Sequence, residues 1–261
     1  FLRNSFNQGI VLGQNINLIK NFKTVSNITK SIRFGIDESG FLASFINQSS
    51  DTIYKYLKFE TEFKYTTKYV NSELAYRFFG GIGFNYNDNN THQTLPFIKQ
   101  FTAGGPYSMR AWGIRQLGLG SSIANDTLNY GTYRDRFGDM QLEYNVEYRF
   151  HLFNIGPVQI KSALFLDIGN IWNLNTYTQD NLAVFNFNKL YNDIAIGIGT
   201  GVRFDFTYLL IRIDFAYKLK DPAREINGGW ANINNLSLYE NRRNGFKVDN
   251  FAFQFGIGLP F

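Results

Sequence analysis

The chain has 261 residues, with 27 Phe and 16 Tyr but only 2 His and no Cys, which excludes disulfides and thiolate metal sites. Its formal net charge of +5 is scattered along the sequence without a Lys/Arg block, so nucleic-acid binding is not expected. The high aromatic content combined with a negative mean hydropathy indicates that apolar residues are interleaved with polar ones.

Alternation of polar and apolar residues predicts about nine β-strands. In chain order they lie at about 8–20, 26–37, 57–69, 72–86, 141–150, 158–172, 194–206, 208–218 and 250–261. In the fifth, Glu143 and Glu147 share a polar face, and Tyr144 and Tyr148 share the opposite apolar face. No amphipathic helix is predicted, and no apolar run approaches the roughly 18 residues that a membrane-spanning helix needs.

The connections between these strands alternate in length. Short ones are expected near 21–25, 70–72, 153–157 and 206–208, and long ones at about 40–53, 87–137, 173–192 and 219–250. Short turns at one end and long loops at the other are typical of outer-membrane barrels. We therefore expect the short turns to be periplasmic and the long loops to be external.

Two architectures fit such strands. A soluble sandwich or lipocalin-like barrel would turn its apolar faces inward, whereas a transmembrane barrel would turn them to lipid. The strand lengths, the Phe and Tyr near strand ends and the alternating connections favour an all-β fold, a transmembrane antiparallel β-barrel. Bacterial barrels mostly have even strand numbers, and lipid cannot satisfy an open sheet edge, so further strands are expected on the N-terminal side. The start "FLRNSFNQ" is typical of a mature portion or fragment.

A glycine-rich and aromatic-rich stretch, "GGPYSMRAW" (104–112), lies in the longest connection. It resembles the sixth-loop motif of the BamA/TamA-like superfamily of outer-membrane assembly factors and two-partner secretion transporters, in which Val or Ile, Arg, Gly and an aromatic residue follow one another. Ala111 stands where the family has Gly, a departure that bears on the backbone of the tip because Ala resists positive φ. The motif residues here are Gly104, Gly105, Met109, Arg110, Ala111 and Trp112.

Downstream segments carry the same resemblance. "FLDIG" (165–169) is similar to the family's Phe-x-Asp-x-Gly motif, "GDMQLEYNVEYRF" (138–150) to the strand before it, and "FQFGIGLPF" to the closing strand. The sequence around these motifs is most similar to that of BamA/TamA-type proteins from Bacteroidetes-like bacteria. The resemblance covers essentially the whole chain, as the last nine or so strands of a sixteen-stranded barrel.

The resemblance implies a role for the arginine. In the family the long loop, here about 88–136, folds into the barrel lumen, and its arginine binds acidic residues of the inner wall. The residues themselves agree, because alternation places Glu147 and Asp167 on the polar faces of their strands. The expected wall partners of the loop are Glu147, Phe165, Asp167 and Gly169.

The resemblance also implies a function: insertion or translocation of other outer-membrane proteins in a Gram-negative cell, without covalent chemistry or a cofactor. The closing strand would form a lateral seam with an absent first strand. The expected partners are the lipid bilayer, unfolded outer-membrane protein clients, upstream periplasmic modules and accessory lipoproteins. The seam residues would be Phe253, Phe255, Gly256, Gly258 and Phe261.

Signals for an enzyme are weak in this sequence. Glu60 and Glu62 alternate with lysines in a charge ladder, which is typical of a solvated polar wall, and no metal-ligand cluster or G-x-S-x-G motif occurs. Three alternatives stay open: a two-partner secretion transporter, the membrane anchor of a patatin-like phospholipase whose active site lies upstream, and a passive porin. Upstream sequence with repeated α+β modules would favour assembly.

Overall fold

A computed structural model describes residues 10–25, 27–41, 53–86, 94–122, 135–175, 180–232, 234, 236–241 and 247–261. Nine antiparallel strands form one sheet in the order β1-β2-β3-β4-β5-β6-β7-β8-β11, which confirms the predicted all-β class. The strands are β1 (Gly13–Val25), β2 (Ile28–Ser39), β3 (Tyr56–Lys68), β4 (Ser72–Asn85), β5 (Met140–Ile155), β6 (Val158–Trp172), β7 (Ala195–Asp205), β8 (Leu210–Lys220) and β11 (Phe251–Ile257).

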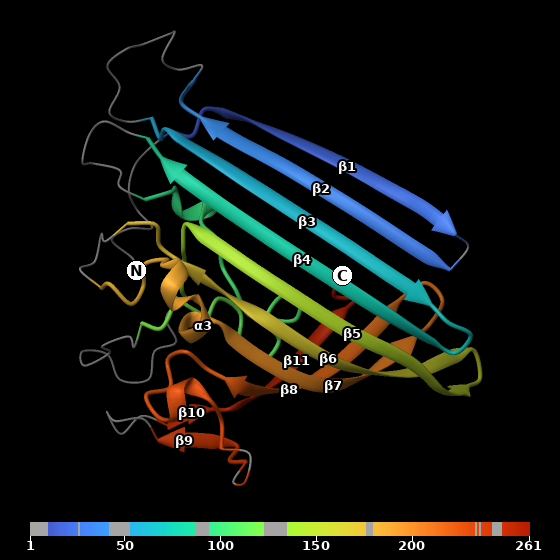
Figure 1. Cartoon of the computed structure of the whole chain (residues 1–261). Coiled ribbons are helices and arrows are strands. Elements are labelled where there is room, and N and C mark those ends of the chain that lie inside the picture. The colour runs from blue at the N-terminus through green and yellow to red at the C-terminus, as the bar shows by residue number, and fades with distance from the viewer. Residues whose placement is uncertain are drawn as a thin grey trace.

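The sheet curves like part of a barrel wall, and its connections separate by length (Figure 1). The long connections gather at one end, and the short turns that join β1 to β2, β3 to β4, β5 to β6 and β7 to β8 lie at the other. Part of the chain between β4 and β5 lies inside the curve of the sheet. Residues 8–9 of the first predicted strand, and 88–93 and 123–134 of the predicted loop, lie outside the described residues.

Two strands run five residues further than predicted. β1 continues to Val25 and β5 to Ile155, so the turns expected at 21–25 and 153–157 are shorter and start later. Each strand contains a register shift, between Lys23 and Val25 in β1 and between His151 and Phe153 in β5. A β-bulge inserts one residue and breaks the alternation, so in β5 the pattern stops at residue 150, short of the true end.

Several small elements in the long connections were not predicted. They are a two-stranded sheet of β9 (Tyr239–Asn241) and β10 (Lys247–Asp249), the helix α3 (Leu190–Asp193), and the 3-10 turns η1 (Phe97–Lys99), η2 (Phe187–Lys189) and η3 (Asn227–Gly229). Three or four residues are too few to display a hydrophobic period. Within the described residues, no helix has the length and apolar character needed to span a membrane.

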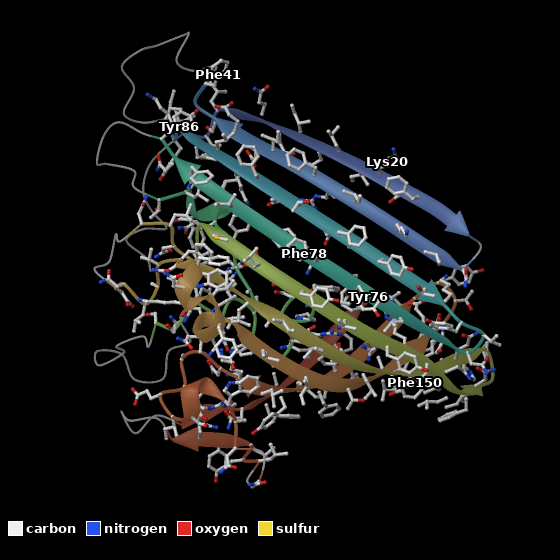
Figure 2. The ribbon with its side chains drawn as sticks, in the orientation of Figure 1. Lys20, Phe41, Tyr76, Phe78, Tyr86 and Phe150 are labelled. Carbon is white, nitrogen blue, oxygen red and sulfur yellow. The ribbon has the colours of Figure 1, made fainter. Side chains whose placement is uncertain are left out.

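Burial across the sheet is the reverse of that in a soluble β-protein. On β5, Glu147 is 0% exposed and Asn145 is buried beside it, whereas Tyr144 is 40% and Tyr148 is 42% exposed. The polar face is thus the concave, covered one. Figure 2 shows the rings of Tyr76, Phe78 and Phe150 on the convex face of the sheet. An outer face of aromatic and aliphatic side chains around a charged interior suits lipid outside and a polar lumen inside.

Among the described residues, β1 and β11 are the two edge strands of the sheet, and each pairs on one side only. β11 ends at Ile257, earlier than the predicted end at Phe261, because Gly258 has a φ of +80° and turns the chain out of the strand. Gly258 and Phe261 therefore lie beyond the closing strand.

Candidate functional site: the inward loop and the lumen wall

The described part of the connection between β4 and β5 packs against the concave face of the sheet. Met109, Ala111 and Trp112 are buried in one apolar cluster with Phe165 of β6 and Ala216 of β8. Residues from a loop thus supply the apolar core that the polar wall lacks. The loop tip is held against the strands on which the acidic wall residues lie.

Arg110 is fully buried between two strands of this wall. Its Nε and Nη2 donate to the two carboxylate oxygens of Asp167 at 2.9 and 2.8 Å, and its backbone N–H donates to the same carboxylate at 3.0 Å. Its Nη1 donates to Glu147. The Phe165 ring lies under the guanidinium, with Cζ 3.5 Å from the ring centroid. A planar fork that reaches two carboxylates while stacking on a ring is a geometry that lysine cannot reproduce.

The Glu147 carboxylate accepts hydrogen bonds from three arginines. Besides Arg110 it accepts from Arg149 Nε at 2.9 Å and from Arg203 Nη2 at 2.9 Å. Arg203 also pairs with Asp214 at 2.8 Å, which links β5, β7 and β8 through one chain of charges. Burial by itself lowers the pKa of Arg110, but the carboxylates of Asp167 and Glu147 outweigh it and raise the pKa of Arg110 above its ordinary value. The loop arginine therefore stays charged.

The backbone of the tip explains the glycines in the motif. Gly104 and Gly105 have φ values of +108° and +93°, which only glycine adopts readily. Ala111 is not among the residues with positive φ, so the departure from the family's Gly causes no strain here. A Cβ added at Gly197 of β7 would lie 2.8 Å from the Ala111 Cβ, so the methyl group of Ala111 packs into the space that Gly197 leaves.

The arrangement of these residues agrees with the comparison to known families. The sequence profile of the Omp85 superfamily domain matches residues 38–261. The chain belongs to the Omp85 superfamily. This confirms the resemblance at the level of the superfamily, and no curated protein matches the chain significantly.

Membership settles the broad class of the protein. An Omp85 domain is a β-barrel, so the curved sheet is part of a barrel wall. Omp85 proteins act in the outer membrane on unfolded protein clients, as transporters or assembly factors and not as enzymes. Protein insertion or secretion is therefore the class of function that the family implies for this chain.

The Omp85 chain also fastens its loop to the closing strand, by contacts that the sequence analysis missed. Gln254 Nε2 of β11 donates to the backbone oxygens of Arg110 and Trp112 at 3.2 and 3.0 Å. The hydroxyl of Tyr107 contacts the backbone of Ile257. A signal for Gln254 was present, because it is a polar residue on the inner face of β11 between Ala252 and Gly256. Nothing in the sequence pairs it with the loop.

The remaining predicted residues lie in three places. Gly169 of β6 backs onto β5, where an added Cβ would lie 2.4 Å from the Leu142 oxygen. Phe253 and Phe255 point to the outer face, away from Arg110. Beyond the strand, Phe261 reaches Arg149 of β5, whose Nη2 donates to the Phe261 oxygen at 3.1 Å.

The Glu60 and Glu62 carboxylates form the charge ladder that alternation predicted. Lys58 Nζ lies 2.9 Å from Glu60, and Lys64 Nζ lies 3.2 Å from Glu62. Arg77 of β4 joins the ladder through Glu62 at 2.7 Å. These carboxylates are neutralised by neighbouring cations, an arrangement that solvates a polar wall.

Proposed function

We propose that the protein is an outer-membrane assembly factor of the BamA/TamA type, which inserts client proteins by lateral opening and strand templating without covalent chemistry. In this proposal the chain is the C-terminal part of a sixteen-stranded barrel. The observation that carries the proposal is the buried contact of Arg110 with Asp167 and Glu147, which holds a loop inside the lumen. A passive porin has no need of such a contact.

The second half of the proposal places the seam at the edge of β11 that faces away from β8. β11 pairs with β8 over seven residues, from Phe251 to Ile257, and its other edge has no strand partner among the described residues. Unpaired N–H and C=O groups along a strand edge can template an incoming strand by β-augmentation. Lipid cannot satisfy these groups, so in the membrane they require either the first strand of the barrel or a client strand.

The loop motif is shared by assembly factors and two-partner secretion transporters, so its placement is consistent with both. Met109, Arg110 and Trp112 are buried on the inner wall, and insertion at the seam leaves them there. Upstream periplasmic modules and accessory lipoproteins remain predictions that go with the assembly role.

A photo-crosslinking experiment tests the seam. A photoreactive amino acid is placed at Phe255 in the full-length protein, which is then reconstituted in liposomes with a urea-unfolded outer-membrane barrel protein as client. The matched control is Leu164 of β6, because the two residues are equally exposed on the outer face, at 56% and 54%. We expect client adducts at 255 and few at 164, together with faster client folding than in empty liposomes. Equal adduct yields at the two positions, or client folding at the empty-liposome rate, would contradict the proposal.

A further inference from the structure

The phenol of Tyr107 contacts both backbone groups of one residue of the closing strand. Its hydroxyl donates to the Ile257 carbonyl at 2.5 Å and accepts from the Ile257 N–H at 3.2 Å. A phenol hydroxyl has one proton and free lone pairs, so one atom can satisfy both groups. Tyr107 comes from the inward loop, 150 residues earlier in the chain.

These two groups belong to the free edge of β11. Successive residues of a strand direct their N–H and C=O groups to opposite sides. The N–H of Gly258 donates to the Leu210 oxygen at 2.7 Å, and the Asn250 oxygen accepts from the Lys218 N–H at 2.8 Å, so even-numbered residues face β8. Ile257 is odd-numbered and faces away from β8. Tyr107 therefore occupies the hydrogen-bonding position that a strand added to this edge would use at residue 257.

Arg212 of β8 holds Tyr107 in this position. Its Cζ lies 4.9 Å from the centroid of the Tyr107 ring, and its Nη2 donates to the Pro106 oxygen. Its Nε donates to the Gly258 oxygen at 3.0 Å. The side chain passes directly against Gly256, where an added Cβ would lie 2.7 Å from the Arg212 Cζ. The glycine in the closing strand thus makes room for the arginine that supports the loop tip.

We propose that Tyr107 is a positioning residue that occupies the last hydrogen-bonding position of the free edge of β11. While Tyr107 is bound, a strand that joins this edge pairs only as far as Phe255. Pairing at Ile257 requires the phenol to leave. Tyr107 lies three residues before the buried Arg110, so anchoring of the loop keeps the phenol at the strand edge. The loop thereby limits how many residues of β11 can pair with an added strand. This inference rests on the proposed function of the seam.

Hydrogen exchange tests the contact without any client. The Ile257 amide is followed by NMR in the full-length protein in lipid nanodiscs, with Tyr107→Phe compared with wild type. This variant keeps the ring over Arg212 and removes only the hydroxyl. The control is Tyr208→Phe, because Tyr208 is fully exposed in the turn between β7 and β8. Loss of a hydrogen bond worth about 0.5–1.4 kcal/mol should speed exchange about two- to tenfold in Tyr107→Phe and leave the control unchanged. Exchange at the wild-type rate in Tyr107→Phe would overturn the inference.

A second measurement extends the test to the seam in action. With a photoreactive residue at Ile257, Tyr107→Phe should increase the yield of client adducts, while the yield at Phe253 stays constant. An unchanged yield at 257 would show that Tyr107 does not limit pairing. The two proposals fail separately. If wild-type protein captures no client at Phe255, the assembly function fails, whereas the exchange of the Ile257 amide still reports whether Tyr107 binds the strand edge.

Discussion

Replacing Arg110 with Ala should release the loop from the wall, and the two carboxylates should not suffer equally. Glu147 keeps Arg149 and Arg203, each at 2.9 Å. Asp167 loses both side-chain hydrogen bonds from the guanidinium and keeps the side-chain amide of Asn145 and, while the loop is docked, the backbone N–H of residue 110, both at 3.0 Å. The free-energy cost therefore falls mainly on Asp167, a buried carboxylate without its cation.

Removing one partner of a buried ion pair costs about 3–5 kcal/mol. If the loop can relieve this cost by leaving the wall, even the lower figure raises the population of released loop about 100-fold, since each 1.4 kcal/mol is about tenfold. Arg110→Lys should fall between Ala and wild type, because an ammonium keeps the charge but cannot make the two-pronged contact with Asp167. The hydrogen-bonded strands are not touched, so the barrel itself should still insert.

Limited proteolysis by chymotrypsin measures the released loop. Trp112 is 3% exposed in the folded protein, so cleavage after it requires the loop to leave the wall. Cleavage should be about 100-fold faster in Arg110→Ala, while the heat-modifiable mobility of the barrel on gels is unchanged. Arg115→Ala is the matched control, because this arginine of the same loop pairs with Asp135 at the surface, at 3.2 Å. Wild-type protection of Trp112 in Arg110→Ala would refute the reasoning.

Three further predictions follow from the wall. Cysteines at neighbouring positions of β3 should label differently with a water-soluble maleimide in intact membranes. Lys64→Cys should react and Phe63→Cys should not, although Lys64 and Phe63 are about equally exposed, at 38% and 39%. The opposite result would mean that the barrel is inside out. Asp167→Asn should weaken loop protection against chymotrypsin more than Glu147→Gln, because the arginines around Glu147 have the further partners Glu73 and Asp214; equal loss would contradict this ranking. Burial raises the pKa of Asp139, just before β5, to about 6, so the folded state binds the carboxyl proton more tightly than the unfolded state. The melting temperature should therefore rise as pH falls from 7 towards 5. Asp139→Asn should flatten this pH dependence, and an unaltered slope would show that another group is responsible.

The features that could be predicted from the sequence are those that depend on residues close together in the chain. Alternation is local, so it located all nine strands of the sheet and assigned Glu147 and Asp167 to the inner face. In β5 it stopped at Phe150, directly before the bulge near His151, because an inserted residue inverts the pattern. The family resemblance pointed to Arg110 as the residue to examine.

The contacts between the loop and the closing strand could not be predicted in the same way. Gln254 and Tyr107 are ordinary residues for their local positions, one on a polar face and one in an aromatic-rich loop. Their partners are separated from them by 142 to 150 residues, and no local pattern encodes which of the inner-face groups meets the loop tip. Side-chain geometry alone reveals that Arg212 passes Gly256 to support Tyr107.

The inward loop has a consequence for the order in which the protein folds. Among the described residues, the wall side chains that hydrogen-bond to Arg110, namely Glu147, Asp167 and Gln254, all follow it in the chain. During synthesis the loop is therefore complete before its binding site exists. Contacts between residues so far apart form late, because the intervening chain must be ordered first. Docking of the loop is thus a closing step, and a docked loop marks a wall whose last strand is already in place.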